Sequence, residues 1–221
     1  MYSQVHNFKC PNCGAPVEIS QEKCSYCDQP VYITSFNTVY SMPDPMVNKY
    51  TAAYKDILQK NPGAADCQNS LAMCFLKLGL YDKALDAFEK AIEHDFENSE
   101  TFFYAAVCLL DGKKAYLTQR PVIDKIEKYI KIALTKEPRG IYYFLQAYIK
   151  YDYYERKSYN TSPTYQEALA SAKKAGFSQF DNELLFRTLN IECPEVLNIF
   201  KSRAGSLSLY LLMNIKEHSD I

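Results

Sequence analysis

The strongest constraint on the fold is an apolar pattern in residues 65–98, which recurs along the chain at a spacing of about 34 residues. Small residues stand where two helices must approach closely, and large residues fill the layer between them. The pattern reads Leu71-Ala72-x-x-Phe75, then Gly79-x-Tyr81, then Ala84-Leu85-x-x-Phe88-x-x-Ala91-Ile92. Gly79 is placed to end a first helix, and Tyr81 to fill the turn. These residues predict two antiparallel helices.

This unit resembles the tetratricopeptide repeat, a helix–turn–helix of 34 residues. Gln68 and Phe96 depart from the family pattern, which has an aromatic residue and a closing proline at these places. The same repeat pattern continues along the chain on both sides of residues 65–98. It predicts half a repeat at 46–64, repeats at 65–98, 99–140 and 141–182, and closing helices at 183–203. Together these form a predicted helical array over residues 41–203, followed by an apolar C-terminal helix and tail at 204–221.

The second and third repeats each carry an insertion of about eight residues between their two helices. The first insertion lies around residues 112–120, and the second places a turn at 158–164. Residues 151–157 mix tyrosines with charged residues, and we expect them in an exposed loop, either as a solvated helix end or as a contact surface. Because both insertions have the same length and fall between the two helices of a repeat, they support this assignment of the repeats.

Two cysteine pairs near the N-terminus predict a metal site. The pairs are Cys10-Pro11-Asn12-Cys13 and Cys24-Ser25-Tyr26-Cys27. A Cys-x-x-Cys turn aims both sulfurs at one point, and two such turns supply the four thiolates of a tetrahedral zinc site. Short strands are expected at residues 15–19 and 31–33, within a module spanning residues 1–40. An iron centre uses the same ligands, and zinc is favoured by its greater frequency.

This segment resembles the zinc-ribbon modules that head many bacterial and archaeal proteins. Four thiolates leave no position for a catalytic water, so one structural Zn²⁺ is expected. The surrounding charges are balanced, with Lys9 and Lys23 against Glu18, Glu22 and Asp28, so nucleic acid is an unlikely partner. Because the module stands where the first helix of the half repeat would be, we expect it to pack near Tyr50 and Tyr54. The predicted fold is therefore mostly α: a short tetratricopeptide-like α-solenoid with a small N-terminal β ribbon.

The resemblance to tetratricopeptide repeats implies that the first helices line a concave groove that holds a peptide or an amphipathic helix. The implied lining residues are mainly apolar and aromatic: Asn69, Met73, Leu76, Phe103, Val107, Leu110, Tyr142, Leu145, Ile149 and Tyr153. The alternative is that a short array buries these residues under its own C-terminal helix. The cysteines outside the pairs are expected to be small core residues: Cys67, Cys74, Cys108 and Cys193.

Composition limits the function classes. A formal net charge of −1 in 221 residues gives no long-range attraction to nucleic acid or anionic membranes. The longest apolar stretch, residues 207–215, is too short to span a bilayer, and no secretory signal is evident, so a cytoplasmic protein is expected. The three histidines lie apart, and no phosphate loop or nucleophile motif occurs. We expect a non-catalytic adaptor or scaffold that binds a protein. The alternatives are a nucleic-acid-associated regulator and a structural subunit of a larger assembly.

Overall fold

The computed structural model describes residues 8–18 and 21–200. The chain divides into two compact units, residues 1–191 and 192–221. The described part of the second unit contains one short 3₁₀ helix, η4 (Glu195–Leu197). The apolar helix predicted at 204–221 lies outside the described residues. The four-cysteine segment and the helical array thus belong to the same compact unit.

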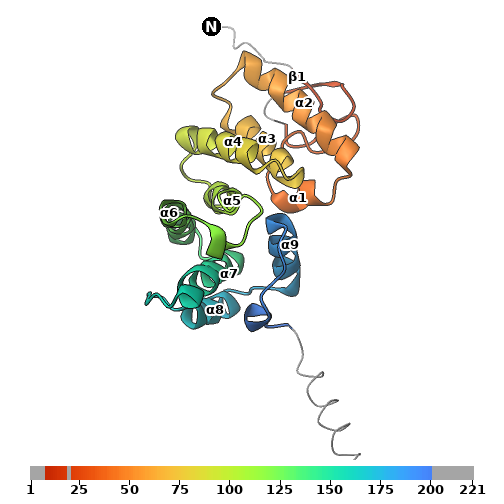
Figure 1. Ribbon diagram of the computed structural model, residues 1–221. Helices are drawn as coiled ribbons and strands as arrows, with labels where there is room; N and C mark the ends of the chain where they lie inside the picture. The colour runs from red at the N-terminus through yellow and green to blue at the C-terminus, as the bar shows by residue number, and fades with distance from the viewer. Residues whose placement is uncertain (1–7, 19–20, 201–221) are drawn as a thin grey trace, which may run out of the picture. The chain divides into compact units, whose positions relative to one another are not determined.

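The first unit is built mainly from antiparallel helix pairs (Figure 1). Helix α2 (Asp44–Lys60) comes first, followed by three pairs: α3 (Ala65–Lys77) with α4 (Tyr81–His94), α5 (Ser99–Cys108) with α6 (Arg120–Lys136), and α7 (Gly140–Ile149) with α8 (Tyr165–Lys174). The first helix of each pair is buried on nearly all sides, whereas the second buries one stripe, such as Ala84, Phe88 and Ala91 in α4. The expectation of a mostly α-helical fold is confirmed.

The turn between α3 and α4 follows from Gly79. This residue has a φ of +70°, a left-handed conformation that glycine adopts without steric cost. The N–H of Gly79 donates to the carbonyl of Leu76, and the N–H of Leu80 donates to the carbonyl of Phe75, at 3.0 and 2.9 Å. These bonds satisfy carbonyls at the end of α3 and reverse the chain direction.

Two further helices pack on the face formed by the first helices of the pairs. They are α1 (Phe36–Tyr40) and α9 (Gln179–Leu189). The ring of Phe36 lies 4.8 Å from that of Tyr104 in α5, and the ring of Phe186 lies 5.6 Å from that of Tyr148 in α7. Figure 1 shows α1 and α9 next to each other, and Nη1 of Arg187 donates to Oη of Tyr40 at 2.7 Å. The sequence did not predict α1, and α9 begins four residues before the expected position 183.

The N-terminal module has little β structure. Strand β1 (Phe8–Lys9) pairs antiparallel with β2 (Pro16–Val17), and Lys23 and Pro30 form an isolated bridge. The strand predicted at residues 31–33 is wrong, since these residues form no ladder. Side chains of the array take its place: Tyr54 Oη donates to the carbonyl of Val31 at 2.9 Å, and Ser70 Oγ bonds both the N–H and the carbonyl of Ile33.

The two insertions adopt helical turns. The first contains a 3₁₀ helix, η1 (Ala115–Leu117). In the second, α7 continues directly into a π-helical segment, η2 (Lys150–Tyr154), and a 3₁₀ turn, η3 (Glu155–Lys157). The expectation of an exposed loop at residues 151–157 is therefore wrong: Asp152, Tyr153 and Tyr154 are buried.

At the start of α7, the backbone at Gly140 packs directly against the backbone of Phe177. A Cβ atom added at Gly140 would lie 2.5 Å from the backbone nitrogen of Phe177, whose ring stacks on Phe144 at 4.0 Å. We expect Gly140→Ala to lower the free energy of unfolding by about 1–3 kcal/mol, because backbone atoms must move apart. Gly63→Ala is the matched control, since its Cβ would meet nothing closer than 3.8 Å. Chemical denaturation of both variants checks this, and equal midpoints would contradict it.

Candidate functional site

Two tight turns bring the four N-terminal cysteines together. In the first, the N–H of Gly14 donates to the carbonyl of Cys10 at 2.9 Å, and in the second the N–H of Asp28 donates to the carbonyl of Cys24 at 2.9 Å. Gly14 and Asp28 have φ values of +77° and +56°, so corresponding positions of the two turns adopt the same left-handed conformation. The two turns are thus alike in backbone geometry, as expected for a pair of metal knuckles.

The sulfur atoms fit one tetrahedral metal ion. All four lie within 4.8 Å of one another. The Cys10–Cys27 and Cys13–Cys24 sulfur distances are 3.8 and 3.7 Å. Four sulfurs each about 2.3 Å from a central zinc would be about 3.8 Å apart, whereas a disulfide bond measures about 2.05 Å. The predicted set of four cysteines is therefore suited to binding one metal ion.

Burial and hydrogen bonding affect the thiols differently. Burial raises the pKa of Cys10 to about 12, whereas the backbone N–H of Gln29 lowers the pKa of Cys27 to about 7. Asn12 adds a side-chain N–H at 3.7 Å from Cys27 Sγ. A buried thiol gives up its proton readily only beside a positive charge, and a divalent cation at the centre of the cluster supplies one.

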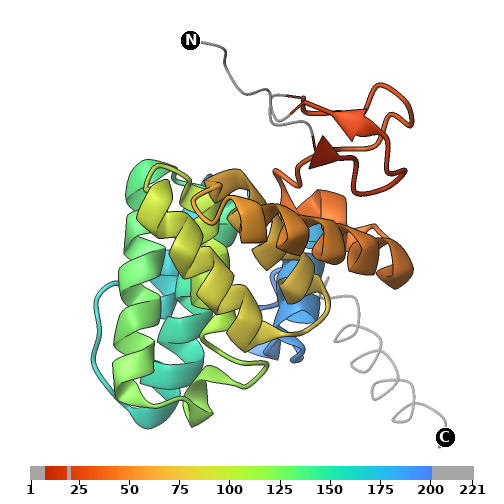
Figure 2. The same cartoon turned by 90° about the horizontal axis from the view of Figure 1, so that it is seen from above.

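The module rests against α2 (Figure 2). Tyr50 Oη donates to the carbonyl of Pro30 at 2.7 Å, next to the bond from Tyr54 to Val31. These are the two tyrosines at which the sequence places the contact. Burial raises the pKa of both phenols above their ordinary range, so both remain neutral donors. The second cysteine turn is therefore followed directly by a segment fixed to the array.

The ten residues predicted to line a partner groove are all buried, with at most 8% of each exposed. Several of them contact residues of the neighbouring first helix. For example, Phe103 stacks on Tyr142 at 4.7 Å, and Thr101 Oγ1 donates to Oδ1 of Asn69 at 3.0 Å. In this structure the predicted lining therefore serves as core, which corrects the expectation of an open groove. The corrected residues are Asn69, Met73, Leu76, Phe103, Val107, Leu110, Tyr142, Leu145, Ile149 and Tyr153.

The cysteines outside the cluster follow the prediction in part. Cys67, Cys74 and Cys108 are buried in the array, and burial raises the pKa of each thiol. Cys193, in the second unit, is half-buried. Within residues 8–18 and 21–200, the N-terminal set is the group of ligands found close enough together to hold a metal ion.

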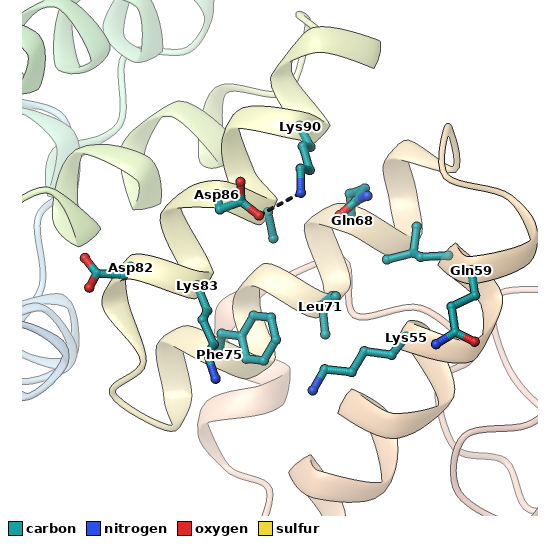
Figure 3. A pocket seen from close by; sticks show the side chains of 11 residues that line it. Lys55, Gln59, Gln68, Leu71, Phe75, Asp82, Lys83, Asp86 and Lys90 are labelled. Carbon is teal, nitrogen blue, oxygen red and sulfur yellow. Dashed lines mark hydrogen bonds and ion pairs between the residues drawn. The ribbon is translucent and has the colours of Figure 1, made fainter.

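An open groove lies elsewhere, between α2, α3 and α4, with a volume of about 680 Å³ (Figure 3). Leu71 and Phe75 of α3 form its floor, between Lys55 of α2 and Lys83 of α4. The ammonium of Lys55 lies 5.3 Å from the centre of the Phe75 ring. The remaining lining is Leu58, Gln59, Gln68, Asp82, Asp86, Ala87 and Lys90. Sequence reasoning missed this groove because its residues belong to three helices and form no motif.

The lysines that line the groove differ in whether they form an ion pair. Lys90 is paired with Asp86 at 2.7 Å, but the described residues provide no ion pair for Lys55 or Lys83. The groove therefore combines an apolar floor with two lysines that have no ion pair among the described residues.

The comparison with protein-family models agrees with the helical pattern. The tetratricopeptide repeat matches residues 65–98. A solved structure titled "MamA MSR-1 C2" has 24% sequence identity and a TM-score of 0.42, covering 64% of this chain and 69% of that chain. A search of curated proteins gave no match.

A membrane-spanning helix is not present among the described residues, since none of their helices has the required length and apolarity.

Tetratricopeptide repeats are built from helix pairs that bind other proteins. Both the family match and helices α3 and α4 fall within residues 65–98. The chain therefore contains a tetratricopeptide repeat, preceded by a four-cysteine cluster suited to binding one metal ion.

Proposed function

We propose that this protein is a non-catalytic adaptor whose helical array binds a partner protein and whose N-terminal module is a zinc ribbon. The observation that carries the proposal is the open groove between α2, α3 and α4, which combines an apolar floor with unpaired lysines. The occupant we infer is an amphipathic segment of a partner. Its apolar side chains would lie over Leu71 and Phe75, and its carboxylates would face Lys55 and Lys83.

Zinc is the ion that we assign to the cysteine cluster. Four thiolates at tetrahedral spacing are its usual structural donor set, although iron shares it. Cys10, Cys13, Cys24 and Cys27 would hold the ion and leave no position for a substrate or water. Its role is then to fold the module, which has a very small core of its own. We place the protein in the cytoplasm, where free thiols remain reduced.

Charge reversal in the groove tests the adaptor function. We expect Lys55→Glu combined with Lys83→Glu to lower the yield of partners co-purified from the native cell by about tenfold, because the reversed charges repel the partner's carboxylates. Quantitative mass spectrometry measures the yield. The control is Lys128→Glu combined with Lys131→Glu, two exposed lysines of α6, because it makes the same change in net charge. Equal yields from the groove variant and the control would refute the proposal.

A second candidate is a structural subunit of a larger assembly. The observation in its favour is that the first-helix face is already filled by α1 and α9, so the usual peptide site of such arrays is occupied by the chain itself. This role predicts one stoichiometric complex that survives high salt, whereas an adaptor held by charged groove contacts releases its partner. Size-exclusion chromatography of the native complex at two salt concentrations separates the two.

A further inference from the structure

The two insertions, which the repeat pattern does not require, bind each other through one buried carboxylate. Asp152 is 2% exposed. It accepts hydrogen bonds from the backbone N–H of Tyr116 at 2.9 Å, from Tyr148 Oη at 3.3 Å and from Arg156 Nη1 at 2.6 Å. Tyr148 Oη in turn accepts from the N–H of Ala115 at 3.1 Å. The first insertion is therefore fixed to the second, and neither is a free loop.

A second buried charge fixes the same segment to α6. Lys150 pairs with Glu127 at 2.5 Å and donates to Thr161 Oγ1 at 2.7 Å. Tyr154 Oη also donates to Glu127, at 2.7 Å, so both ends of the π-helical segment are held. Within the described residues, no buried side-chain nitrogen or oxygen is left without a partner. Fully satisfied polar networks of this kind fix a unique geometry.

The outer surface over this network is apolar and aromatic. Leu117 is 70% exposed, and Tyr116 and Tyr159 are also exposed. The ammonium of Lys157 links the two insertions, at 3.9 Å from the ring centre of Tyr153 and 5.0 Å from that of Tyr116. The Tyr153 ring continues the row to Tyr159 at 6.3 Å. We call this surface the insertion edge.

The insertion edge also carries two lysines that are not in ion pairs, Lys114 and Lys157. Residues 111–120 and 150–164 contain six lysines and arginines. Four of these are in ion pairs: Lys113 with Asp111, Arg120 with Asp124, Lys150 with Glu127 and Arg156 with Asp152. Asp152 is buried, so it offers no carboxylate to a ligand. Lys114 is exposed, and the described residues provide no ion pair for it. Lys114 and Lys157 are therefore the cations of the edge that have no ion pair among the described residues, and they accompany exposed apolar side chains.

We propose that the insertion edge is a second docking surface, which binds an acidic segment of a partner protein that also carries apolar side chains. The partner's carboxylates would pair with Lys114 and Lys157, and its apolar side chains would contact Leu117 and Tyr159. Because the buried network already holds the edge in place, binding costs little ordering of this chain. The edge lies on the insertions of the second and third repeats, apart from the lining of the groove between α2, α3 and α4, so neither proposal depends on the other.

Fluorescence anisotropy with defined probes tests this surface on the full metal-bound chain. The probes are a labelled peptide in which Glu alternates with Leu, the same peptide with Lys in place of Glu, and a single-stranded DNA oligonucleotide. We expect the chain to bind the acidic peptide in preference to both other probes. Lys114→Glu and Leu117→Ser should each weaken this binding by about fivefold or more, and added salt should weaken it further.

Matched controls make the result decisive. Lys131→Glu makes the same charge change on an exposed part of α6, and Leu80→Ser removes another exposed leucine. Both should change the affinity by less than about twofold. Because Lys114 and Leu117 are exposed, their variants should keep the wild-type circular dichroism spectrum. Tighter binding of DNA, no binding of the acidic peptide, or equal losses in the control variants would each overturn the proposal.

Discussion

Cys24→Ser is expected to abolish metal binding and unfold the N-terminal module. Cys24 is 1% exposed, and a serine hydroxyl does not replace a thiolate as a ligand for a soft metal. In small modules a structural zinc ion contributes about 10–16 kcal/mol of apparent folding free energy, which the module would lose. Since Tyr50 and Tyr54 bond to Pro30 and Val31 next to the cluster, the melting temperature of the array should also fall.

Two measurements check this result. Elemental analysis should find one metal ion per chain in the wild type and none in the variant, and it also distinguishes zinc from iron. Thermal unfolding followed by circular dichroism reports the stability of the array. Cys193→Ser is the control, because this cysteine lies outside the cluster, in the second unit. An unchanged metal content in Cys24→Ser would contradict the four-ligand site.

Phe103→Ala should be strongly destabilising, with a loss of about 3–5 kcal/mol in the free energy of unfolding. Phe103 is 1% exposed, and its ring contacts those of Tyr142 and Tyr104 at 4.7 and 4.9 Å. Removing the ring leaves a cavity between the adjacent helices α5 and α7. The alternative, an open groove at this face, predicts a small effect on stability and a large effect on binding.

Phe180→Ala provides the matched control for this substitution. Phe180 is on α9 but is 51% exposed, so its truncation should cost less than about 0.5 kcal/mol. Urea denaturation of both variants gives the comparison. Similar, small losses for Phe103→Ala and Phe180→Ala would show that the first-helix face is open in solution.

Much of the fold follows from local sequence patterns. The spacing of Ala84, Phe88 and Ala91 gives the buried stripe of α4, and Gly79 gives the turn before it. The cluster of four cysteines was predicted from the sequence, because two Cys-x-x-Cys turns leave few alternative geometries. In each case the interactions join residues that are close in sequence or belong to one short motif.

From the sequence, a cover on the first-helix face was one of two alternatives, because it depends on distant parts of the chain. Apolar residues that line an open groove and apolar residues that pack under another helix give the same pattern, so Phe103 and Tyr142 were compatible with both. A signal did exist in α9, where Leu184, Leu185 and Phe186 are too apolar for an exposed closing helix. The five residues of α1 were too few to show helical periodicity.

The contact between α1 and α9 changes how the first unit should respond to unfolding. In an open solenoid each repeat touches only its neighbours, so terminal repeats can fray while the middle persists. Here Arg187 bonds Tyr40 across 147 positions, and Tyr81 Oη donates to the carbonyl of Thr188 at 2.8 Å. Hydrogen bonds thus connect α9, near the C-terminal end of the unit, to α1 and α4 in its N-terminal half. Loss of either end exposes the apolar face that both ends cover, so the repeats gain or lose their structure together.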